Sequence, residues 1–126
     1  MTNSDNTPAT LPGGQPRPPV PKGLREMLKD YPEHIERLQE VLNYVVETSS
    51  AGVSPFDRAI WVLEARLETF ISEARDELEA AEASGDAEAI ARAKDKKYLM
   101  GSSRHRGMHN LHDLHLYFQA NKDAFE

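Results

Sequence analysis

The chain has 126 residues, of which 39% are hydrophobic and 29% are charged, and its formal net charge is −6. This length predicts one domain with or without a tail, and the acidic balance argues against broad binding to nucleic acid or anionic membranes. The absence of cysteine excludes disulfides, thiolate metal sites and cysteine nucleophiles. Because no apolar run approaches the length of about 18 residues that a membrane span needs, we expect a cytoplasmic protein.

Residues 1–21 are predicted to form a disordered, proline-rich arm, and residues 22–126 the folded domain. Six of the eight prolines lie in the arm, and its sizeable apolar side chains after Met1 are Leu11 and Val20. Such a segment buries too little apolar surface to offset the entropy lost on ordering. We interpret the arm as a linker, with a polyproline II docking motif or a secretion signal as alternatives.

The first helical region is predicted over about 23–47, with a break near residue 32. Asp30 or Tyr31 is expected to cap its second part, because Pro32 suits the first helical position and disfavours helix in the residue before it. Beyond the break, apolar residues recur at three- and four-residue spacing, which places them on one face of a helix. These are Ile35, Leu38, Val41, Leu42, Val45 and Val46.

The second helix is predicted over 55–83 and has the clearest start in the chain. Ser54 is the expected N-cap, Pro55 the first helical residue, and Asp57 lies in the first turn, where its charge complements the helix dipole. The apolar positions then repeat about every 3.5 residues, a spacing typical of a coiled coil or a long antiparallel hairpin. They are Phe56, Ile60, Leu63, Leu67, Phe70, Ala74, Leu78 and Ala81.

The third helix is predicted over 87–121, after a turn at residues 84–86. Gly85 suits a left-handed C-terminal position, and Asp86 is the expected cap of the following helix. The weak part of this helix is residues 101–107, where two glycines each cost about 1 kcal/mol relative to alanine. We expect a kink, a break or a hinge there.

Together these elements predict an all-α fold. We expect a three-helix bundle built on a long antiparallel α-hairpin with a coiled-coil-like seam, residues 55–83 against 87–121. The helix of residues 23–47 is expected to pack near the open end of the hairpin, so that the hairpin tip projects from the bundle.

Histidines in the last quarter of the chain are the candidate metal ligands. His105, His109 and His112 are separated by four and three residues, spacings that place them on one face of a continuous helix, where neighbouring pairs can chelate zinc or another divalent transition metal. Further ligands would have to come from another helix or chain, with Asp57 and Glu64 the nearest carboxylates in the predicted hairpin. The alternative is a solvated polar face, which we favour.

Charge is segregated along the predicted hairpin. Residues 57–91 hold ten acidic and three basic side chains, whereas residues 92–106 hold six basic and one acidic. The acidic helix folding back onto the basic segment explains both, because such charges set the register of a hairpin. Alternatively, the basic segment beside Tyr98 contacts phosphates.

Three large side chains lie off the predicted core faces: Trp61, Leu116 and Tyr117. Either the first helix covers them, or they form an interface with a second copy or another protein.

The sequence lacks the spacing of known catalytic motifs, so we expect no enzyme. The leading hypothesis is a helical protein–protein interaction module, such as an adaptor, a chaperone-like protein or an inhibitory partner, that forms a homodimer. The first alternative is a metal-binding or metal-responsive helical protein that uses the histidine cluster. The weaker alternative is nucleic-acid binding through residues 92–106.

Overall fold

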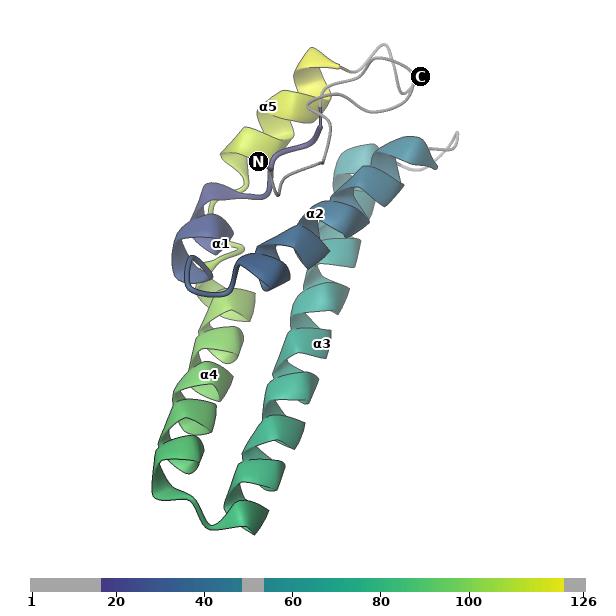
Figure 1. The fold of residues 1–126 in the computed structure, drawn as a ribbon. Coiled ribbons are helices and arrows are strands. Elements are labelled where there is room, and N and C mark those ends of the chain that lie inside the picture. Colours follow the sequence, from purple (N-terminus) through teal and green to yellow (C-terminus); the bar gives the residue numbers. More distant parts are fainter. Residues whose placement is uncertain (1–16, 49–53, 122–126) are drawn as a thin grey trace, which may run out of the picture.

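The computed structural model describes residues 17–48 and 54–121. These residues form five α-helices and no strand (Figure 1). The helices are α1 (Lys22–Met27), α2 (Pro32–Glu47), α3 (Pro55–Ser84), α4 (Ala87–Arg106) and α5 (His112–Ala120). The predicted all-α class is confirmed. The three predicted helical regions appear as five helices, because the first region is broken before Pro32, as expected, and the third is interrupted after Arg106. Most of the predicted arm, residues 1–16, lies outside the described residues.

Helices α3 and α4 are the two longest, and they run antiparallel, side by side, from a short turn (Figure 1). The Ser54 Oγ caps α3 by accepting a hydrogen bond from the backbone N–H of Asp57. Gly85 ends α3 in the left-handed conformation, with φ of 74°. The Asp86 carboxylate then caps α4, accepting from the backbone N–H of Glu88 at 3.0 Å. These caps are the ones that the sequence predicts.

The core lies at the end of the α3–α4 pair away from Gly85, where α1, α2 and α5 cover it (Figure 1). Helix α2 packs on α3, α1 packs on α4, and α5 packs on the first turns of α3. The fully buried apolar side chains are Leu24, Leu28, Leu38, Leu42, Val45, Ala59, Leu63, Leu67, Phe70, Met100 and Leu114. Beyond α2, the rest of α3 and α4 projects as a pair of helices alone (Figure 1). No described helix is long and apolar enough to cross a membrane.

An ion pair fixes α2 on α3. The Arg37 guanidinium donates two hydrogen bonds to the Glu73 carboxylate, both at 2.8 Å, and its central carbon lies 4.8 Å from the centre of the Phe70 ring. This bidentate contact lowers the pKa of Glu73 and raises the pKa of Arg37. It defines the crossing point of the two helices.

His34 is buried at the same junction and is 6% exposed. Its ring centre lies 4.4 Å from that of Phe70 and 5.5 Å from that of Tyr31. The His34 Nδ1 has no hydrogen-bond partner among the described residues. Burial, together with the positive charges of Lys96 and Arg37, lowers the pKa of His34. The imidazole is therefore neutral near pH 7 and acts as a packing group between α2 and α3.

The last residues of the predicted arm belong to the folded domain. Pro18, Val20 and Pro21 are buried. The Gln39 Nε2 donates a hydrogen bond to the Pro18 carbonyl at 2.8 Å, and the Arg25 Nε donates to the Val20 carbonyl at 2.9 Å. The predicted boundary at residue 21 therefore lies too far along the chain. The segment before it is held on α1 and α2 by buried side chains and by the hydrogen bonds that its carbonyls accept.

The predicted helix over 87–121 is interrupted, and the break lies at residues 107–111. Gly101 remains inside α4, whereas Gly107 ends it. A Cβ on Gly107 would collide with the Leu24 side chain and would approach the Ser103 carbonyl oxygen to 2.6 Å. Gly107 is thus required where α1 crosses the end of α4. After the break, α5 starts as a separate helix.

Candidate binding groove on helix α4

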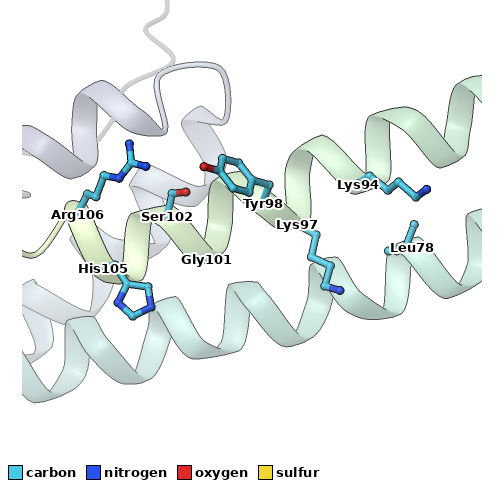
Figure 2. Close-up of a pocket in the computed structure, with 8 residues that line it drawn as sticks. All are labelled: Leu78, Lys94, Lys97, Tyr98, Gly101, Ser102, His105 and Arg106. Carbon is cyan, nitrogen blue, oxygen red and sulfur yellow. The ribbon is translucent and has the colours of Figure 1, made fainter.

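A hollow of about 730 Å³ lies along the surface of α4 and reaches α3 at one edge (Figure 2). We call it the α4 groove. Seven of its eight lining residues come from α4, so the shape of the hollow is set by one helix. The lining residues are Leu78, Lys94, Lys97, Tyr98, Gly101, Ser102, His105 and Arg106.

Helical spacing brings these side chains around Gly101. Lys97 and His105 lie four residues before and after Gly101, so all three share one face of the helix. Tyr98 and Ser102 lie along the neighbouring face (Figure 2). Gly101 has no atom within 4 Å of the position that a Cβ would take, which leaves the middle of the groove open.

The basic side chains of α4 fall into two sets. One set is neutralised: the Lys96 Nζ lies 2.9 Å from a Glu77 carboxylate oxygen, and the Arg104 Nε lies 3.0 Å from one of Glu68. Arg92 pairs more loosely with an acid of its own helix. The other set lines the groove and has no ion-pair or hydrogen-bond partner among the described residues: Lys94, Lys97 and Arg106.

Tyr98 supplies the aromatic surface of the groove and is 70% exposed. The groove also contains the Ser102 hydroxyl and the His105 imidazole, but no carboxylate. Its polar groups are therefore cations or neutral hydrogen-bond donors and acceptors, and they favour an anionic ligand with an apolar part.

The predicted metal site is not formed. His105 lies in the groove on α4, His109 lies in the α4–α5 connection, and His112 is the first residue of α5. The described part of the chain holds no group of three or more histidine, aspartate or glutamate side chains that could bind a metal ion. The shared helix face that the prediction assumed is absent, because α4 ends at Arg106. A site made of two of these histidines with ligands from a second chain stays a prediction. Of the two carboxylates predicted near these histidines, that of Glu64 instead lies 3.8 Å from a guanidinium nitrogen of Arg104.

The three predicted interface residues have different surroundings. Trp61 on α3 is 62% exposed, and Leu116 on α5 is 50% exposed. Tyr117 is only 8% exposed and packs edge-to-face on Phe118, with ring centres 5.0 Å apart. Burial raises the pKa of Tyr117 to about 12. Tyr117 therefore belongs to the core and is not available for the predicted interface.

Sequence analysis did not single out two features of the surface. One is Tyr44, which is exposed on α2 and lies two residues after the buried Leu42, off the apolar stripe. The other is the division of the basic segment into paired and unpaired sets. The spacing of Lys94, Lys97 and Gly101 does place them on one face, but only the position of α3 shows which cations find a carboxylate.

Comparisons of the chain with protein-family models, with curated proteins and with solved structures find no match. The α4 groove is therefore interpreted from its own chemistry: unpaired cations, one exposed aromatic ring and an open centre at Gly101.

Proposed function

We propose that this protein is a non-enzymatic helical protein–protein interaction module, acting as an adaptor, a chaperone-like protein or an inhibitory partner. The observation that carries the proposal is the α4 groove, where Lys94, Lys97 and Arg106 lie around an exposed tyrosine. None of these three cations has an ion-pair partner among the described residues, so each is available to a carboxylate of another protein. Tyrosine and arginine are also enriched at the energetic centres of protein interfaces.

The arrangement of α3 and α4 supports the same proposal. We interpret this pair as an antiparallel hairpin with a coiled-coil-like seam, on which α2 forms the third layer of a small bundle. The part of the hairpin beyond α2 adds little to the core and presents two helical surfaces to the solvent (Figure 1). We expect the protein to act in the cytoplasm, since a chain without cysteine suits a reducing compartment.

A binding experiment tests the proposal. The full chain is immobilised and exposed to native lysate, beside the Lys97→Glu variant and a control variant, Lys29→Glu. Lys29 is exposed, has no partner among the described residues and lies outside the groove, so the control makes the same charge change elsewhere. We expect partner proteins on the wild-type chain and on the control. If no protein is retained by the wild type and the chain does not self-associate, the proposed function is wrong.

We also propose that the chain forms a homodimer. Trp61 and Leu116 are large exposed apolar side chains, and a tryptophan of this kind is a typical anchor of an interface. Sedimentation velocity over a concentration series tests this. We expect a monomer–dimer equilibrium that shifts toward monomer in Trp61→Ala, and a monomer at every concentration would contradict the dimer.

The second candidate function is nucleic-acid binding through residues 92–106. The observation in its favour is the position of Lys94 and Lys97 beside Tyr98, since cations next to an aromatic ring are typical of single-strand binding surfaces. This function requires an affinity that falls steeply with salt concentration and responds to neutralisation of Lys97.

A further inference from the structure

We propose that the α4 groove binds an acidic, amphipathic α-helix of a partner protein. In this complex the carboxylates of the partner helix pair with Lys94, Lys97 and Arg106, and its apolar stripe covers Tyr98 and Leu78. The inference rests on the proposed function and names the kind of partner that the groove accepts.

The length of the groove fits a short helix. From Lys94 to Arg106 the axis of α4 rises by about 18 Å, which corresponds to about three turns of a helix lying along it. Lys94 and Lys97 are three residues apart, so carboxylates spaced three or four residues apart on such a helix reach both of them. Arg106 lies nine residues after Lys97, at the other end of the groove. A ligand with one negative charge would engage only a part of this row.

Gly101 explains why the ligand is a helix rather than an extended segment. Two helices pack 8–10 Å apart, depending on the side chains at their contact, and the closest approaches need small residues. Gly101 has open space above its Cα, and its neighbour Ser102 is small. The backbone of a partner helix therefore comes close to α4 at this point, while the longer side chains on either side enclose it.

Charge complementarity selects acidic side chains. Two other cations of α4 already have carboxylate partners from α3, with nitrogen–oxygen distances of 2.9 Å for Lys96 and 3.0 Å for Arg104. The groove lacks such a partner and contains no acid of its own. In the complex, an acidic helix supplies carboxylates to the unpaired cations, as α3 does to the paired ones.

The surroundings of the groove favour a protein helix over a nucleic acid. Helix α3 carries the exposed acid Glu79 next to the groove residue Leu78, and residues 57–91 hold ten acidic side chains against three basic ones. A polyanion that extends past the groove meets these charges and is repelled, whereas a helix of three turns ends within it. The groove also offers one aromatic ring, and single-strand binding surfaces use a series of rings to stack successive bases.

The test uses the full chain and three probes labelled with fluorescein. The first probe is a synthetic helical peptide of glutamate, leucine and alanine, with glutamates along one stripe and leucines along the next. The second probe is the same peptide with lysine in place of glutamate. The third is a single-stranded oligouridylate. Binding is measured by fluorescence anisotropy, and the folding of each variant is followed by thermal denaturation.

Two substitutions disrupt the groove in different ways, and Lys29→Glu is the matched control. Lys97→Glu reverses one unpaired charge. Gly101→Leu changes no charge and places a larger side chain at the open centre, where nothing lies within 4 Å of the added Cβ. Thermal denaturation checks that this variant folds. We expect both groove variants to bind the acidic peptide at least about tenfold more weakly than the wild type. The control should retain the wild-type affinity, and the melting temperature of Gly101→Leu should not fall.

Several results would overturn the inference: no binding of the acidic peptide to the wild type, equal binding of the lysine peptide, tighter binding of the oligouridylate, or an unchanged affinity in Gly101→Leu. Its failure is distinguishable from that of the proposed function. If the full chain still captures protein partners or dimerises while Lys97→Glu has no effect on them, the proposed function stands and the assignment of the groove is wrong.

Discussion

Leu63, Leu67 and Phe70 of α3 are fully buried beneath α2, whereas Leu78, on the same apolar repeat, is partly exposed at the edge of the α4 groove. The repeat determines which face of α3 turns toward α4 in both places. Complete burial needs a third helix, and α2 covers only the part of the pair that is distant from Gly85 (Figure 1). The covered half is thus held by packing, and the uncovered half depends on helix caps and ion pairs.

The largest expected effect comes from truncating one apolar side chain in each half. Phe70→Ala removes a fully buried ring at the α2–α3 crossing and should cost about 3–5 kcal/mol of unfolding free energy. Leu78→Ala removes a partly exposed side chain and should cost about 1 kcal/mol or less. Urea denaturation of the two variants measures the difference. Equal losses would show that the uncovered half contributes to the core as much as the covered half.

Gly101 and Gly107 sharpen the comparison, because a side chain would meet different surroundings at the two positions. Gly107→Ala places a Cβ against Leu24 and the Ser103 carbonyl, and it should destabilise the fold by about 1–3 kcal/mol. Gly101→Ala places its Cβ in open space inside a helix and should stabilise the fold by about 1 kcal/mol. Thermal and urea denaturation test the opposite signs. A loss of stability in both would mean that the centre of the groove is occupied by part of the chain itself.

The same two glycines show what can be predicted from the sequence. Local signals placed the ends of α3 and the start of α4 to within a residue, because Ser54, Gly85 and Asp86 act through their own backbone. The site of the break between α4 and α5 depends on Gly107 meeting Leu24, a contact between residues far apart in the chain. The burial of Tyr117 likewise depends on how α5 packs after this break, which the sequence alone does not determine.

The candidate site also has one part that the sequence predicts and another that only the packed structure shows. The sequence shows that residues 92–106 are basic and that they include Tyr98. Which cations remain without a carboxylate follows from the rotation of α4 against α3, since Lys96 and Lys97 are neighbours in the chain and yet only Lys96 reaches Glu77. That rotation is a property of the packed pair of helices.

A smaller effect is expected at the cap of α4 in the uncovered half. Asp86→Ala removes the hydrogen bond to the Glu88 backbone N–H and should cost about 1 kcal/mol. Hydrogen exchange should become faster in the first turn of α4 and remain slow around Phe70, because the two halves are stabilised independently. Asp95→Ala is the matched control, since Asp95 is an exposed acid of the same helix outside the cap. Faster exchange throughout the core would contradict the independence of the halves.

The pH dependence of stability should come from the covered half, through His34. Its imidazole lies among Lys96, Arg37, Glu33 and Glu73; burial and the two cations lower its pKa, and the two acids oppose them. The unfolded chain binds the proton near the ordinary pKa of about 6.5, whereas the folded chain binds it only at lower pH. The unfolding free energy is therefore highest above pH 6.5 and decreases as the pH falls below that value.

Urea denaturation between pH 5 and pH 8 measures this decrease, and the His34→Leu variant should show a flatter dependence over that range. The lowered pKa of Glu73 acts in the same direction, but only near and below its ordinary value of 4.5, so the two contributions are separated by pH. A slope that persists in His34→Leu would assign it to another group. Because His34 stabilises the α2–α3 junction and the groove lies beyond α2, any protonation of His34 should weaken the fold without changing how a folded molecule binds an acidic helix.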